Sequence, residues 1–286
     1  MPSALTTLTQ INLDDFFDSM GLLHLRHTPL RWLFWPAARR FARLTVEFDD
    51  RVGAQSLAAG SAWLLQTMTG GLWVAGREHV PANGPAFILA NHPGMADTIA
   101  LFASLATRPD LRVMALERPF LRALPNVSQQ TIYVPTREAE RMNVVRAGVK
   151  HLKQGGALLT FPAGEIEPDP AAFGTTAAVA SLQHWSESVA VFARLAPQTQ
   201  LIPTVVSHVV SSAALHHPLT HLRRTQRDKE KLAAALQVMW PGYQHTAARV
   251  AFGPPIVAND LTRLMPALID QARQLIEAPP GEWEHR

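Results

Sequence analysis

The chain has 286 residues, of which 47% are hydrophobic and 17% are charged, and its formal net charge is +3 at pH 7. It contains no cysteine, which excludes disulfides, thiolate nucleophiles and cysteine-ligated zinc or iron–sulfur centres. The apolar content is enough for a sizeable core and for a surface that contacts lipid, and the mildly basic balance suits anionic headgroups, phosphorylated substrates or nucleic acid alike. Residues 1–10 lack a basic start followed by an apolar stretch, so we expect no secretory signal and a cytoplasmic protein.

Residues 1–70 are predicted to form a helical region that docks on a membrane. Residues 1–20 are polar to mixed and are expected to be a poorly ordered lead-in. Between Leu22 and Asp50, helical spacing places an aromatic face opposite a basic face, and Pro36 is expected to kink or restart the helix. This pattern is typical of an interfacial membrane helix, and the alternative is a core helix with solvated arginines. The candidate membrane-contact residues are Trp32, Trp35, Phe41, Arg39 and Arg40.

The next stretch, Val52–Gly76, is uncharged but too polar and too interrupted for a confident membrane span. We interpret it as a helix to about Met68, a Gly-Gly break and a strand. A two-helix unit that lies on the membrane therefore fits better than a transmembrane helix, followed by a second domain over residues 71–286.

Within residues 71–286, short apolar strands alternate with amphipathic helices, one of which ends at Gly155-Gly156 while the last covers residues 260–276. This alternation predicts an α/β fold with a mixed, largely parallel central sheet flanked by helices. The predicted strands are Leu72–Ala75, Phe87–Ala90, Leu111–Leu116, Thr131–Val134, Ala157–Phe161, Leu201–Val206 and Arg249–Phe252.

The clearest candidate site follows the second of these strands, where Asn91-His92-Pro93-Gly94 breaks the apolar run and Asp97 lies in the first turn of a helix. A carboxylate held against one imidazole nitrogen fixes the tautomer and makes the other nitrogen a better base. His92 and Asp97 are therefore the candidate catalytic pair. The alternative interpretation is a capped helix with an incidental histidine.

Three more strand ends carry unusual residues: Arg137 follows one strand, Phe161-Pro162-Ala163-Gly164-Glu165 another, and Ile202-Pro203 lies in a third. Together with Asn-His-x-x-x-x-Asp, these blocks resemble those of the glycerophospholipid acyltransferases, the lysophosphatidic acid acyltransferase group, in the same order and with similar gaps from about Leu72 to Ile256. The block that ends in Arg137 looks one residue longer than is usual in the family.

The resemblance implies a 1-acylglycerol-3-phosphate O-acyltransferase-like enzyme of phospholipid biosynthesis, with acyl-CoA or acyl carrier protein as co-substrate and neither cofactor nor metal. It implies His92 as general base oriented by Asp97, and backbone N–H groups near Gly94 or Gly164 as candidates to hold the oxyanion. The substrate-binding candidates are Arg137, Phe161, Pro162, Gly164 and Glu165. The implied partners are a lipid surface and the acyl carrier rather than nucleic acid, with the enzyme peripheral on the inner face of the cell membrane.

The third block departs from the family pattern Phe-Pro-Glu-Gly-Thr-Arg, because Ala163 replaces the glutamate and Ile166 replaces the arginine. Glu165 and Glu167 add negative charge that would repel a phosphate, although Glu167 is expected to be solvated. Either Arg137, helped by Arg118 or Arg122, binds the phosphate alone, or the acceptor is non-phosphorylated or amine-bearing.

A lipid-binding protein without turnover is the alternative from another class. For Arg137 the alternative role is a surface salt bridge with Glu138 or Glu140. His216, His217 and His221 have no carboxylate or cysteine close in the sequence, so we expect a solvated loop there and not a metal site.

Overall fold

The computed structural model describes residues 3–135, 137, 141–258 and 260–285. Its strands are β1 (Leu72–Ala75), β2 (Ala86–Ala90), β3 (Arg112–Leu116), β4 (Thr131–Val134), β5 (Ala157–Thr160), β6 (Gln200–Ser207), β7 (Ala248–Phe252), β8 (Ile256–Val257) and β9 (Glu284–His285). The seven predicted strands are all present, with ends shifted by one residue at most, whereas β8 and β9 were not predicted.

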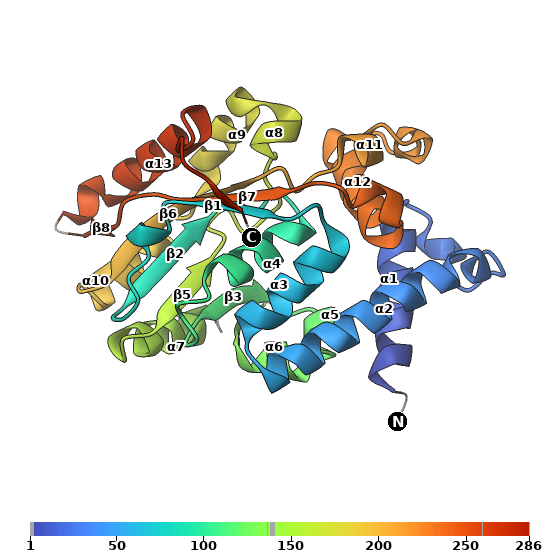
Figure 1. Ribbon diagram of the computed structural model, residues 1–286, viewed down its shortest axis with the longest axis horizontal. Coiled ribbons are helices and arrows are strands. Elements are labelled where there is room, and N and C mark those ends of the chain that lie inside the picture. Colours follow the sequence, from blue (N-terminus) through green and yellow to red (C-terminus); the bar gives the residue numbers. More distant parts are fainter. Residues whose placement is uncertain (1–2, 136, 138–140, 259, 286) are drawn as a thin grey trace.

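In the described part of the chain these strands form a single sheet in the order β4-β3-β5-β2-β6-β7-β1-β9, with β8 beside β6 (Figure 1). The strands from β4 to β6 are mutually parallel. Strand β7 is antiparallel to β6, and β1 is parallel to β7. The predicted mixed, largely parallel sheet is therefore confirmed, and β2, which carries the candidate histidine at its carboxyl end, lies inside the parallel block.

Helices surround this sheet. They are α1 (Ala4–Ser19), α2 (Arg31–Ala54), α3 (Leu57–Met68), α4 (Met95–Ser104), α5 (Pro119–Arg122), α6 (Pro125–Gln129), α7 (Arg141–Lys153), α8 (Pro170–Phe173), α9 (Thr175–Ser181), α10 (Ser188–Leu195), α11 (Ser212–Leu215), α12 (Gln226–Met239) and α13 (Leu261–Glu277). Short 3₁₀ helices are η1 (Leu23–Leu25), η2 (Arg77–His79), η4 (Leu182–His184), η5 (Pro218–Leu222) and η6 (Pro241–Tyr243). Helices α5 and α6 each have a proline in the first turn, where no amide donor is needed.

Strand β2 is buried on both faces because helices cover both sides of the sheet. Ile88 and Ala90 belong to a core that includes residues of α3 and α4. Phe87 and Leu89 belong to a second core formed with α7, α9, α10 and α13. A strand in this position has no polar face, which explains why it appears in the sequence as an uninterrupted apolar run.

The N-terminal segment is an ordered helix, so the poorly ordered lead-in expected for residues 1–20 is wrong. Helix α1 begins after Ser3, whose side chain accepts a hydrogen bond from the Thr6 amide. Its apolar side packs against α2 and α12 around an aromatic cluster in which the Phe16 ring lies 4.9 Å from Phe34 and 5.5 Å from Trp240. Asp15 and Asp18 are exposed on the other side of this helix. Figure 1 shows α1, α2 and α12 gathered at one end of the molecule.

Helix α2 continues through Pro36 as one element from Arg31 to Ala54. Near its C-terminal end, the buried Asp49 carboxylate accepts hydrogen bonds from the backbone amides of Asn126 and Val127, at 3.0 and 2.9 Å, and so ties α2 to the start of α6. Within the described ranges, no helix combines the length and the apolar character needed to cross a bilayer.

Candidate active site

The candidate site lies where parallel strands end. The carboxyl ends of β2, β4 and β5 lead into His92, Arg137 and Phe161, respectively. Just before His92, the buried Asn91 amide group donates to the Val206 carbonyl at 3.0 Å and accepts from the Val206 amide at 2.7 Å. Asn91 thereby holds the end of β2 against β6, which fixes the backbone from which His92 projects.

His92 and Asp97 are in direct contact, as their spacing predicts. The His92 Nδ1 atom lies 2.7 Å from Asp97 Oδ2, and the Asp97 side chain is completely buried. Asp97 also accepts hydrogen bonds from the Gly94 amide at 2.8 Å and from the Thr98 hydroxyl at 2.9 Å. An ionised carboxylate only accepts, so Nδ1 carries the hydrogen and the lone pair is on Nε2. The His92 side chain is 30% exposed.

Two charges act on the imidazole of His92. Desolvation by burial lowers its pKa, but the charge and hydrogen bond of Asp97, together with the charge of Glu167, outweigh that effect and raise the pKa above its usual value. A base with a raised pKa accepts a proton more readily and loses basic function at a higher pH as the solution is acidified. The geometry therefore favours protonation of His92.

The segment after β5 packs against His92. The Phe161 ring stacks on the imidazole with ring centroids 4.4 Å apart and an interplanar angle of 25°. Pro162 is buried, and Gly164 has a φ of +67°, a conformation that suits glycine. The Glu165 carboxylate is partly exposed and lies 3.7 Å from the His184 ring.

Near the predicted oxyanion site, the N–H groups of Gly94 and Gly164 themselves are both engaged in hydrogen bonds. The Gly94 N–H donates to Asp97, and the Gly164 N–H donates to the Phe161 carbonyl at 3.0 Å. Both hydrogen bonds stabilise the local turns. The sequence shows that glycine is present at these positions but not that its amide is engaged.

Glu167 is not solvated, so that expectation is wrong. The residue is 3% exposed, and its Oε2 accepts a hydrogen bond from the His92 backbone amide at 3.0 Å. Its Oε1 accepts from the Trp185 indole at 3.0 Å and from the Ser181 hydroxyl at 3.2 Å. Burial raises the pKa of Glu167 to about 7 despite these donors.

Asp169 is a second buried carboxylate that the sequence analysis missed. Its oxygens accept hydrogen bonds from the consecutive amides of His208, Val209 and Val210 at 2.8 to 3.0 Å, and from Ala171 at the start of α8. It joins the segment after β5 to the segment after β6. The alternation of acids at 165, 167 and 169 is a signal that could have found both residues, since alternate residues of an extended chain point to the same side.

The central part of the chain is similar to a known protein family. A family model described as Acyltransferase matches residues 72–207. The matched stretch contains His92, Asp97, Phe161 and Glu167. Comparison of the sequence with curated proteins found no match. The chain is also similar to the crystal structure of the 1-acyl-sn-glycerophosphate acyltransferase PlsC from Thermotoga maritima, with 12% identity and a TM-score of 0.46, over 87% of this chain and 99% of that one.

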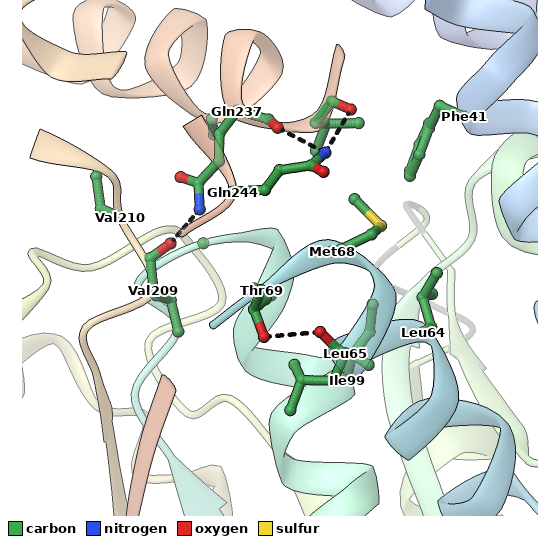
Figure 2. A pocket seen from close by; sticks show the side chains of 14 residues that line it. Phe41, Leu64, Leu65, Met68, Thr69, Ile99, Val209, Val210, Gln237 and Gln244 are labelled. Atoms are coloured by element: carbon green, nitrogen blue, oxygen red, sulfur yellow. Dashed lines mark hydrogen bonds between the residues drawn. The ribbon is translucent and has the colours of Figure 1, made fainter. Parts of the chain in front are cut away.

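Residues 72–207 and the helices around them share an apolar pocket beside the first turn of α4 (Figure 2). Its empty space is about 570 Å³, including the part open to solvent, and Gly94 and Ala96 are among its lining residues. The amides of Gln237 and Gln244 also line it and donate to backbone carbonyls, including that of Val209. The apolar walls include Phe41, Leu64, Leu65, Met68, Ile99 and Val209.

The cations proposed for phosphate recognition are not all equally accessible. Arg137, which follows β4, is exposed, while its suggested partners Glu138 and Glu140 lie outside the described residues. Arg122 pairs with Glu117 at 2.7 Å and lies over the Tyr133 ring at 3.9 Å. Arg122 is therefore already engaged in contacts within the protein. Ile166, which stands where the acyltransferase pattern has an arginine, is 40% exposed.

The candidate membrane-contact residues divide into exposed and buried groups. Trp32 is 65% exposed, and Trp35 is partly buried beneath it with a ring-centroid distance of 5.6 Å. Phe41 is buried, lines the pocket and stacks on Phe120, so its assignment to the membrane is wrong in this structure. The reason is that the aromatic face of α2 packs inside the protein.

The two arginines assigned to the membrane are partly buried. Arg39 is half-buried, and Arg40 donates to the Gln244 side chain at 3.5 Å. Leu33, which follows Trp32, was not among the predicted membrane-contact residues, but it is 70% exposed. Among the described residues, no group of three or more metal-ligating side chains is close enough to hold a metal ion, and His217 accepts a hydrogen bond from the Leu219 amide instead.

Proposed function

We propose that this protein transfers a fatty acyl group from acyl-CoA or acyl carrier protein to a hydroxyl of a glycerophospholipid precursor similar to 1-acylglycerol-3-phosphate. The observation that carries the proposal is the 2.7 Å contact between His92 and the buried Asp97, within the residues that match the acyltransferase family model. It is supported by the partial exposure of His92 and by the apolar pocket beside it.

The chemistry requires one proton to move twice. His92 Nε2 removes the proton of the acceptor hydroxyl while the oxygen attacks the thioester carbonyl carbon. Asp97 stabilises the imidazolium that forms, and the tetrahedral intermediate then breaks its carbon–sulfur bond. The imidazolium returns the proton to the leaving thiolate, so the enzyme regains its starting state. A positioned general base of this kind contributes about 10²- to 10⁴-fold to the rate.

The pocket in Figure 2 is the proposed site for part of the acyl chain. Its walls are almost entirely apolar, and the polar groups of Gln237 and Gln244 are already hydrogen-bonded to carbonyls. Transfer of a hydrocarbon chain from water to such a surface lowers its free energy by about 25 cal/mol per Å² of apolar surface buried. Gly94 and Ala96, which line this pocket, lie between His92 and Asp97 in the sequence.

The acceptor is the least constrained part of the proposal. The exposed Arg137 supports a phosphorylated acceptor, whereas Ile166 and the partly exposed Glu165 favour a neutral or amine-bearing one. We therefore retain an acyltransferase with a non-phosphorylated acceptor as the second candidate, and a lipid-binding protein without turnover as the third.

We also propose that the protein works on a lipid surface, at the inner face of the cell membrane, where both acyl donors are available. The exposed side chains of Leu23, Leu30, Trp32 and Leu33, here called the N-terminal apolar patch, support this proposal. Exposed aromatic and aliphatic side chains near arginines are typical of proteins that bind at the membrane interface.

The function is tested by offering labelled acyl-CoA and acyl carrier protein thioesters with a panel of phosphorylated, neutral and amine-bearing acceptors, and by identifying the product by mass. We expect an ester product that His92→Ala fails to make and that the exposed control His221→Ala makes at the parent rate. Lipid binding without any product from the parent protein would refute the enzyme and leave the binding protein.

Membrane binding is tested separately by flotation with anionic liposomes. We expect the double variant Trp32→Ser and Leu33→Ser to stay with the soluble fraction more than the parent does. A matched control changes the exposed Leu261 to Ser, at the opposite end of the chain. Flotation equal to that of the parent would refute the role of the N-terminal apolar patch.

A further inference from the structure

Residue 167 holds the backbone of His92 at two points. The Glu167 amide donates to the His92 carbonyl at 2.9 Å, and the Glu167 carboxylate accepts from the His92 amide at 3.0 Å. Both polar groups of the His92 backbone are therefore bound by a single residue that lies 75 positions further along the chain. This double contact fixes the segment after β5 against the segment after β2.

The Glu167 carboxylate is itself held in place. Trp185 and Ser181 both donate to its second oxygen, and Trp185 is buried. A buried carboxylate with three donors cannot rotate without breaking hydrogen bonds in a region from which water is excluded, where an unpaired polar group costs free energy. The carboxylate therefore keeps a fixed position relative to the catalytic histidine.

Glu167 thus acts on His92 through two hydrogen-bond contacts and one charge. We propose that Glu167 is a positioning residue for the catalytic base: it fixes the backbone of His92 and, together with Asp97, stabilises the imidazolium that forms during acyl transfer. This inference rests on the proposed function, because it assigns Glu167 a part in that same reaction. Trp185 and Ser181 act through Glu167.

The charges that act on this pair support the inference. Among the residues that the structure describes, Asp97 and Glu167 are the charged groups that raise the pKa of His92. The charged group that acts on Glu167 is His92. Removing the Glu167 charge should therefore lower the pKa of His92. A residue with only a structural role would change the stability of the fold without moving this pKa.

The decisive variant is Glu167→Gln, which keeps the size of the side chain but not its charge. A glutamine has one acceptor oxygen, so its NH₂ group must face either the His92 amide or the Trp185 indole. Glu187→Gln is the matched control, because Glu187 is exposed and two residues from Trp185. Both variants are compared with the parent by NMR titration of the His92 imidazole, assigned from its absence in His92→Ala, and by kcat and kcat/KM as functions of pH.

We expect the pKa of His92 and the acid limb of kcat/KM to move to lower pH in Glu167→Gln and to stay unchanged in Glu187→Gln. We also expect kcat to fall by about tenfold or more, the scale of one lost hydrogen bond to a charged group, with little change in KM. A folded Glu167→Gln protein with the titration curve and acid limb of the control would overturn the inference.

Two features keep this test independent of other failures. The NMR titration needs no enzymatic activity, so it tests the effect of Glu167 on His92 even if acyl transfer is not found. Absence of acyl transfer would refute the proposed function alone. If Glu167→Gln does not fold, Trp185→Phe replaces it. Loss of the indole donor disfavours the ionised form of Glu167 and should lower the pKa of His92 in the same direction, and an unchanged pKa would again overturn the inference.

Discussion

Replacing Asp97 by asparagine isolates the charge of the residue that orients His92. In the structure, the same Asp97 oxygen accepts from His92 Nδ1 and from the Gly94 amide, while the other oxygen accepts from the Thr98 hydroxyl. Asparagine retains all three contacts if its oxygen faces His92 and Gly94, because the Thr98 hydroxyl can turn to accept from the NH₂ group. The opposite orientation places NH₂ against the Gly94 N–H, which costs about 1–3 kcal/mol.

The size of the effect follows from this preferred orientation. A hydrogen bond to a charged group contributes roughly 1.5–3 kcal/mol and a neutral one roughly 0.5–1.5 kcal/mol. The difference of about 1–2 kcal/mol corresponds to a loss of about 5- to 30-fold in kcat/KM. An asparagine in the opposite orientation would select the wrong imidazole tautomer, for which losses of about 10⁴-fold are known in catalytic triads.

The assay is kcat/KM for acyl transfer from pH 5 to 9, with Asp270→Asn on the surface of α13 as control. Asp97 raises the pKa of His92, so the acid limb should move to lower pH in Asp97→Asn and remain in place in the control. An Asp97→Asn protein with the parent's kcat/KM and acid limb would refute the reasoning that Asp97 acts on His92 through its charge.

Three further results are expected. Asp169→Ala leaves the amides of residues 208–210 without their acceptor and should lower the free energy of unfolding by about 2–5 kcal/mol, measured by urea denaturation; a loss below 0.5 kcal/mol would contradict this. The pKa of Glu167 is raised from 4.5 to about 7, so the folded state binds its proton more tightly, and stability should fall by about 3 kcal/mol as pH rises through this range. Glu167→Gln should lack that pH dependence, and an equal slope in both proteins would contradict it. Ala234→Phe, in the pocket wall, should lower kcat/KM for long acyl chains more than for short ones in a competition assay, and equal losses would exclude the pocket as the acyl site.

The parallel strands were predictable because burial on both faces leaves no polar position in them. Strand β2, with its Phe87–Ala90 run, is the clearest case, and the turn that follows it brings His92 and Asp97 together over only five positions. Local sequence is sufficient where the partners are this close in the chain. The order of the strands and the antiparallel β7 depend on contacts between distant segments, which periodicity does not reveal.

The role of the aromatic face of α2 was not predictable from its own sequence. Phe34 and Phe41 have the spacing of a membrane-facing helix, but α1 and α12 cover the first and Phe120 covers the second. A hydrophobic face has the same periodicity whether it contacts lipid or protein. Only the exposed fraction distinguishes Trp32 from Phe41.

Glu167 shows the corresponding limit for polar residues. An acidic residue in a loop rich in proline and glycine is usually solvated, and the sequence indicated no partner. Its donors come from Trp185, Ser181 and the His92 backbone, which lie 14 to 75 positions away. The burial of such a carboxylate becomes apparent only when the strand ends are assembled.

The most direct measurement of the central claim is chemical rescue of His92→Ala. With acyl-CoA and the best acceptor, kcat/KM should fall by about 10²- to 10⁴-fold and recover in part, in proportion to the concentration of added imidazole base. Transfer by His92→Ala at the parent rate, without any dependence on imidazole, would show that the His92 side chain is not the base.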